Sequence, residues 1–195
     1  MQISRRNCNK LWGSVALFLA AGISPFATGC GIFSDILAWT NIAGIAIDGI
    51  VNVLGPFMPP GGGQIIQLIK AFLTDLAGTV TEYENDTNPA DKATLLAKIR
   101  TLLGDIATNF QSFLAQINLG ANPIVNVVIG LAQVILAAIA GFLGQLPTPA
   151  TIPLRFSVSG KPLVVAPVYY KRVSDFKAAY NAVCIADGHT ELELR

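Results

Sequence analysis

The feature that most constrains this fold is a long stretch of chain without charge. No Lys, Arg, Asp or Glu occurs between Asp105 and Arg155, and the segment Ile124–Leu143 lies inside this stretch. As an α-helix that segment would be about 30 Å long, the thickness of the hydrocarbon core of a bilayer. It must therefore be buried, either inside a protein core or in a membrane.

Small and polar residues form one stripe along this expected helix, at a spacing near that of a helical turn. In a membrane, such a stripe lets two helices approach closely and oligomerise. In a bundle, the same stripe faces a neighbouring helix or forms a narrow polar edge that is exposed to water. We favour the bundle, because short capped turns connect the segment to amphipathic partners. The stripe comprises Asn126, Gly130, Gln133, Ala137, Gly141 and Gly144.

The composition favours contact with membranes or lipids and excludes one class of partner. Hydrophobic residues make up 52% of the 195-residue chain and charged residues 13%, about half the share usual in soluble domains. The net charge is +1, and no basic block or basic-aromatic pattern occurs, so nucleic-acid binding is not expected.

Three further segments have apolar residues at helical spacing, within 30–146. They run from about Phe33 to Leu54, from Gln64 to Tyr83 and from Pro89 to Ile117, and prolines or glycines separate them. Asn88 before Pro89, with Asp91 in the first turn, predicts a helix that starts at Pro89. Gly120 and Asn122–Pro123 predict the next helix end and start. The simplest arrangement that buries four such apolar sides is a mainly α, up-down bundle of about four helices.

The last third of the chain, 147–195, has a different pattern. "PTPATIP" predicts a stiff linker, and the alternation in "RFSVS" and "LVVAPVYY" around "GKP" predicts a β-hairpin or an extended strap on the bundle. Ser174 is the expected cap of a final helix, Asp175 to about Ala186, with Gly188 just beyond its end. We expect this helix to dock on the bundle.

The first residues have the pattern of an export signal. Arg5, Arg6 and Lys10 precede an uncharged apolar run, Leu11–Ile23, which is short for a permanent membrane span. Ala27-Thr28-Gly29-Cys30 then resembles the lipobox of bacterial lipoprotein precursors, except that Ala27 stands where that family prefers Leu. Ser4-Arg5-Arg6 also resembles a twin-arginine export signal, with Cys8 and Asn9 where that family has Phe and Leu. The export route therefore stays open between the Sec and twin-arginine routes, and we favour Sec.

The lipobox resemblance implies cleavage of a signal peptide, 1–29, and transfer of diacylglycerol to the Cys30 thiol. Two or three acyl chains anchor a protein stably, whereas one does so marginally. The alternatives are ordinary signal cleavage and an uncleaved anchor in which Cys30 is a small buried residue. If Cys8 is removed and Cys30 is acylated, Cys184 has no cysteine to pair with and is expected to be buried.

No residue pattern predicts a catalytic, cofactor or metal site. His189 lies near Asp187, Glu191 and Glu193 but lacks the spacing of a zinc or hydrolase motif, so we interpret it as part of an exposed turn. Asp35 and Asp48 are interpreted as solvated bundle residues, and Tyr169–Tyr170 as strand aromatics.

Three functions are compatible with these patterns. The first is a non-enzymatic lipoprotein of the cell envelope, attached to the membrane by Cys30, whose bundle binds an apolar ligand or an envelope protein. The second is a protein that inserts Ile124–Leu143, with or without 32–54, into the membrane and oligomerises through the small-residue stripe. The third, an enzyme that uses His189, is the least favoured.

Overall fold

Helices dominate the structure, which is a computed structural model that describes residues 29–117, 124–147, 155–158 and 161–195. Within these ranges, the long helices are α1 (Gly29–Leu54), α2 (Gly62–Asn85), α3 (Pro89–Gln116) and α4 (Ile124–Gln145). A short 3-10 turn, η3 (Gly55–Phe57), follows α1. The predicted mainly α fold is confirmed.

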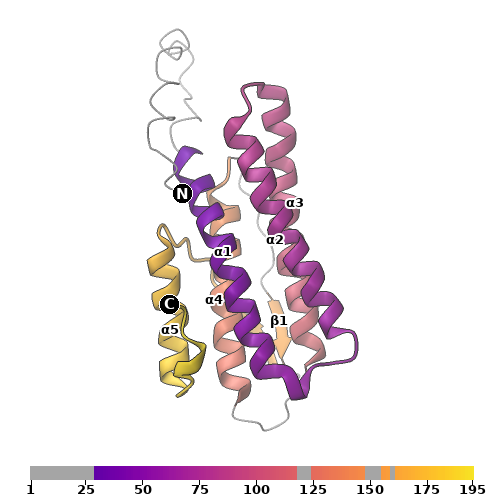
Figure 1. Cartoon of the computed structure of the whole chain (residues 1–195), viewed down its shortest axis with the longest axis vertical. Coiled ribbons are helices and arrows are strands. Elements are labelled where there is room, and N and C mark those ends of the chain that lie inside the picture. Colours follow the sequence, from indigo (N-terminus) through magenta and orange to yellow (C-terminus); the bar gives the residue numbers. More distant parts are fainter. Residues whose placement is uncertain (1–28, 118–123, 148–154, 159–160) are drawn as a thin grey trace.

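The four long helices lie side by side (Figure 1). α1 contacts α2 and α4, and α3 contacts the same two helices, so each has two neighbours around a shared core. Figure 1 places the start of α1 and the turn between α2 and α3 at one end of the molecule, and η3 at the other. The predicted signal peptide, 1–29, lies outside the described residues except for Gly29.

The start of α3 is where the local pattern predicted it. Asn88 is the N-cap, and its Oδ1 accepts a hydrogen bond from the backbone N–H of Ala90 at 3.0 Å. Pro89 occupies the first helical position, where no N–H is needed. The Asn88 Nδ2 also donates to the Asp91 Oδ2 at 2.7 Å, so the first turn is closed by two side-chain hydrogen bonds.

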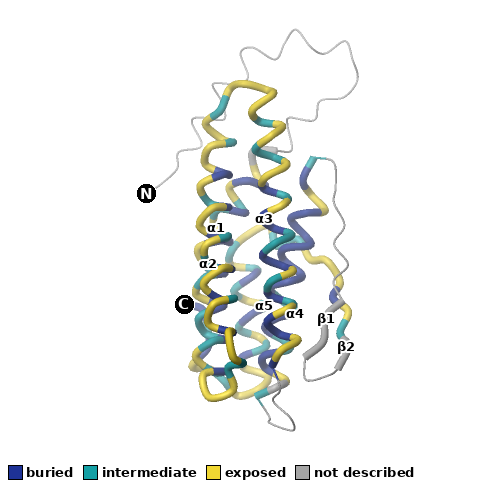
Figure 2. The backbone as a smooth tube through the Cα atoms, turned by 90° about the vertical axis from the view of Figure 1, so that its right-hand side faces the viewer, coloured by how far each residue is buried: buried dark blue, intermediate teal, exposed yellow. Residues whose placement is uncertain are grey.

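The core is continuous across the four helices, as the dark blue inner sides in Figure 2 show. Along α3 nearly every apolar residue of the predicted stripe is buried, and the first turns are half-buried. The Phe110 and Phe113 rings stack with their centroids 6.5 Å apart. The buried stripe comprises Ile99, Leu102, Leu103, Ile106, Phe110, Phe113, Leu114 and Ile117.

A β-hairpin and a fifth helix cover the bundle. β1 (Arg155–Val158) pairs antiparallel with β2 (Lys161–Val164), in the register Phe156 opposite Leu163, and β1 packs on α3. Residues 165–172, which we call the strap, have no helix or strand and connect β2 to the last helix. α5 (Val173–Ala186) then packs on α4 and α1, and a 3-10 turn, η4 (Thr190–Leu192), ends the chain's helical structure.

Two details of this C-terminal segment differ from the sequence prediction. α5 starts at Val173, because the Arg172 carbonyl accepts hydrogen bonds from the N–H groups of Asp175 and Phe176 at 3.0 and 3.3 Å. Ser174 therefore lies in the first turn and is not the cap. Tyr169 and Tyr170 lie in the strap and not in a strand, since β2 ends at Val164. Gly188 follows α5 with φ +76°, as its predicted role beyond the helix end requires.

Candidate functional site

Cys30, the predicted lipidation residue, lies in the first turn of α1. The chain enters the core almost at once, because Ile32 is 4% exposed and Phe33 is 1% exposed. The apolar run Leu11–Ile23 and the lipobox residues Ala27 and Thr28 lie outside the described residues. The structure therefore describes the backbone of α1 from Gly29 onward and the side-chain packing of the residues after Cys30.

Two helices in the described part of the chain are long and apolar enough to cross a membrane by length and composition. They cover Gly31–Phe57 in α1 and η3, near the N-terminus, and Asn126–Gln145 in α4. In α4, 78% of the apolar window is buried inside the protein, against 39% in the first. The exposed side of α1 carries Ser34, Asn41 and Asn52. Most of the apolar window of α4 is thus covered by the rest of the chain.

The small-residue stripe of α4 is the surface on which the C-terminal segment rests. A Cβ atom added to Gly141 would lie 2.2 Å from the carbonyl oxygen of Val168, and one added to Gly130 would lie 2.5 Å from Val183 Cγ1. The backbone N–H of Val168 donates to the carbonyl oxygen of Ala137 at 3.0 Å. Only glycine allows the strap and α5 to approach α4 this closely.

Aromatic rings join α1, α4, the strap and α5 at one junction. Trp39 makes edge contacts with Phe142 and Phe176, at centroid distances of 5.5 and 6.3 Å. Phe142 in turn contacts Tyr169 edge-on at 5.9 Å. Aromatic pairs of this kind contribute about 0.5–1.5 kcal/mol each beyond their buried area, so the junction fixes the strap and α5 to the bundle.

Two tyrosine hydroxyls tie the same junction to α1. The Tyr169 hydroxyl donates to the Asp35 Oδ2 at 2.6 Å, and the Tyr180 hydroxyl donates to the Ala46 carbonyl at 3.0 Å. Burial raises the pKa of both tyrosines, and the Asp35 carboxylate raises that of Tyr169 further. Both hydroxyls therefore stay neutral at physiological pH and act as hydrogen-bond donors.

The predicted solvated role of Asp35 is thus only partly correct. Asp35 is half-buried and accepts the Tyr169 hydrogen bond, a pairing across 134 residues that no local pattern indicates. Asp48 is half-buried and forms an ion pair with Lys70 of α2, which joins the last third of α1 to the first half of α2. Neither carboxylate adjoins a second acid or a nucleophile in these contacts.

His189 belongs to the turn after α5, as expected. Its Nδ1 donates to the Glu191 Oε1 at 2.8 Å, and this hydrogen bond lowers the pKa of the Glu191 carboxyl. Across the described ranges, no group of three or more His, Cys, Asp or Glu residues is placed to hold a metal ion. Cys184 is buried and unpaired, and burial raises the pKa of its thiol to about 11, which makes it an unreactive core residue.

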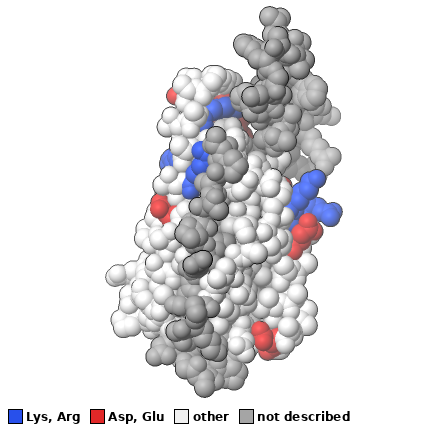
Figure 3. Space-filling model, turned by 180° about the vertical axis from the view of Figure 1, so that it is seen from behind, with Lys and Arg blue, Asp and Glu red and all other residues white. Residues whose placement is uncertain are grey.

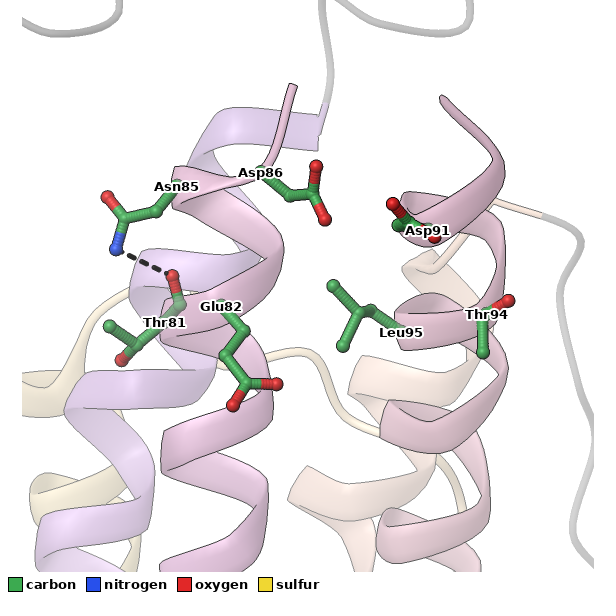
Figure 4. Close-up of a pocket in the computed structure, with 7 residues that line it drawn as sticks. All are labelled: Thr81, Glu82, Asn85, Asp86, Asp91, Thr94 and Leu95. Carbon is green, nitrogen blue, oxygen red and sulfur yellow. Dashed lines mark hydrogen bonds between the residues drawn. The ribbon is translucent and has the colours of Figure 1, made fainter. Parts of the chain in front are cut away.

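A polar notch lies between the ends of α2 and α3 (Figure 4). Asp86 and Asp91 face it from the two helices, and Leu95 lies below them. Thr81 and Asn85 form its outer wall, where the Asn85 Nδ2 donates to the Thr81 carbonyl at 2.9 Å. The notch is open to solvent, and Glu82 and Thr94 complete its lining.

Charged residues are unevenly spread over the surface. On the face drawn in Figure 3, basic and acidic side chains lie near the α2–α3 end and near α5, and the described surface between them is largely uncharged. This follows from the sequence, since the chain between Asp105 and Arg155 contributes none. A scan against protein-family models, a search of curated proteins and a search of solved structures each found no match.

Proposed function

We propose that the protein is a non-enzymatic lipoprotein of the bacterial cell envelope, anchored through acyl chains on Cys30. The observation that carries this proposal is the order of features at the N-terminus. A basic segment, an apolar run and small residues precede Cys30, and the packed core begins at Ile32. Cleavage before Cys30 would therefore release a complete bundle and leave its first residue at the membrane.

The folded part then acts as a binding or structural module. Its interior is occupied by large side chains such as Trp39, Phe142 and Phe176, all at most 2% exposed. This packing favours a protein partner on the outer surface over an apolar ligand held between the helices. An apolar fluorescent dye should accordingly show no saturable binding to the lipid-free protein, and saturable binding would favour the apolar ligand.

The alternative function, membrane insertion with oligomerisation through the stripe on α4, is less well supported. The stripe already contacts the strap and α5 through Gly141 and Gly130. Insertion of α4 would require these contacts to break and Phe142 to separate from the Trp39 and Tyr169 rings.

Fractionation of bacteria that express the full chain tests the anchor. The wild-type protein should sediment with membranes and partition into the detergent phase of a Triton X-114 extract. Cys30→Ala should abolish attachment of labelled fatty acid, whereas Cys8→Ala, which alters a cysteine in the segment to be removed, should leave it intact. Fatty acid on the Cys30→Ala variant would contradict the proposal.

A further inference from the structure

The anchor and the folded bundle are separated by almost no chain, which restricts where the bundle can lie. This step rests on the proposed acylation of Cys30. Ile32 and Phe33 are both buried, so only Gly31 separates the acylated residue from the core. Two extended residues span about 7 Å at most. A bundle with so short a tether cannot move away from the membrane surface.

The start of α1 is fixed to the neighbouring α2–α3 turn. The Phe33 ring of α1 packs on the Tyr83 ring of α2 with centroids 4.1 Å apart. The Lys92 Nζ of α3 lies 4.9 Å from the centre of the same Tyr83 ring. Residues 84–91, which we call the α2–α3 tip, continue beyond these contacts. Figure 1 shows this tip at the same end of the molecule as the start of α1.

The chemistry of the tip suits a headgroup layer and not the hydrocarbon below it. Its residues are polar or small, and most are exposed, including Glu84, Thr87 and Asn88. No large apolar side chain occurs among residues 84–91. Residues 82–92 carry four carboxylates and one lysine, so anionic lipids should repel this end and ammonium groups should attract it. The acidic residues are Glu82, Glu84, Asp86 and Asp91.

We propose that the α2–α3 tip contacts the headgroup layer of the membrane that holds Cys30, with a preference for zwitterionic, ammonium-bearing lipids. The bundle then stands on this end. The opposite end, which includes η3 and the first turn of α2, points away from the membrane and is presented to partners.

The orientation can be measured with a fluorescent label at either end of α2. Thr87→Cys places a thiol on the tip, and Gln64→Cys places one at the far end, about 30 Å away along the helix axis. Both native residues are exposed. Thiol reagents at neutral pH should leave Cys184 unlabelled because it is buried, and acylated Cys30 has no free thiol. The wild-type protein treated in the same way gives the background.

The acylated variants are reconstituted in phosphatidylcholine vesicles that contain a lipid with a spin label on its headgroup. We expect the label at residue 87 to lose most of its emission and the label at residue 64 to keep it. Equal quenching at both positions would show a bundle lying flat and would overturn the proposal. So would an unquenched label at residue 87. An intact mass without acyl chains would instead refute the anchor itself, so the two failures are distinguishable.

The lipid preference has its own control. Replacing part of the phosphatidylcholine with phosphatidylglycerol should reduce quenching at residue 87, because the four carboxylates of residues 82–92 are repelled. Glu82→Gln combined with Glu84→Gln should diminish this reduction. If the labelled Thr87→Cys protein that keeps Glu82 and Glu84 were quenched equally in both kinds of vesicle, the preference for ammonium-bearing headgroups would be overturned.

Discussion

Tyr180 connects α5 to α1 through a hydrogen bond that forms inside the core. Its side chain is fully buried, and its hydroxyl lies 3.3 Å from where a Cβ on Gly49 would be. Because burial raises its pKa, the neutral hydroxyl stabilises the fold at every pH below the tyrosine pKa of the unfolded chain, about 10. That stability is lost as the pH rises above this value.

Tyr180→Phe should lower the free energy of unfolding at pH 7 by about 1 kcal/mol, the usual net value of one hydrogen bond. The variant should then lose less stability than the wild type between pH 9 and 11, because one of the groups that must ionise is gone. Urea unfolding followed by circular dichroism at these pH values measures both effects. The same alkaline loss in the two proteins would contradict this role of Tyr180.

Asn88 offers a second test at the residue scale, since it alone caps α3 with a side chain. Asn88→Ala should reduce the free energy of unfolding by about 1 kcal/mol. Asn85→Ala is the matched control: its amide only adds a bond to a helical carbonyl, so the change should stay within about 0.5 kcal/mol. Urea titrations of both variants supply the comparison, and equal losses would show that the cap has no special role.

At the scale of elements, the main feature of α4 is that the C-terminal segment packs very closely against it at a glycine. Gly141→Ala would force a Cβ into the backbone of Val168 and Tyr169, at 2.2 to 2.6 Å, and backbone cannot rotate away as a side chain can. Gly144 lies one turn further along the same helix, is exposed, and has nothing within 4 Å of its would-be Cβ.

Gly141→Ala should therefore lower the free energy of unfolding by about 1–3 kcal/mol through overpacking. Gly144→Ala should raise it by about 0.5–1 kcal/mol, because alanine favours the helix over glycine. Thermal unfolding of the two variants beside the wild type decides this, and equal effects would mean that the strap does not rest on Gly141.

Elements were predictable from the sequence where local chemistry decides them. The Asn88–Pro89 start of α3 is one example, and the buried stripe along that helix is another. The start of α5 was missed by two residues because no local cap marks it; Arg172 becomes the N-cap without a side-chain bond. The junction joins Trp39 to Phe142 and Tyr169, both more than 100 residues later in the chain, and periodicity within one segment carries no information about such contacts.

The candidate site was only partly predictable for a different reason. The proposed lipidation of Cys30 rests on a resemblance over four residues, and such a short motif can be proposed from the sequence without any knowledge of the fold. The glycine stripe was visible in the sequence, but its partner was not. Contact with Val168 and Val183 depends on how the chain returns after α4.

At the scale of the whole molecule, the surplus of apolar residues is largely accounted for by the core. The window Asn126–Gln145 is mostly buried, and the exposed side of α1 is small or polar apart from Ile45, which is 59% exposed. A lipid-free chain that begins at Gly31 should therefore be soluble without detergent, helical and monomeric or a small oligomer. Size-exclusion chromatography with light scattering checks this. A chain that remains soluble only in detergent would favour membrane insertion of α4.

The most direct test of the anchor is the intact mass of the protein extracted from bacterial membranes, measured beside the Cys30→Ala variant. We predict that the wild-type chain begins at Cys30 and carries two or three acyl chains, and that the variant carries none. A wild-type protein that retains Met1 and has the mass of the unmodified chain would contradict the account, and the apolar helices α1 and α4 would then need a membrane-embedded explanation.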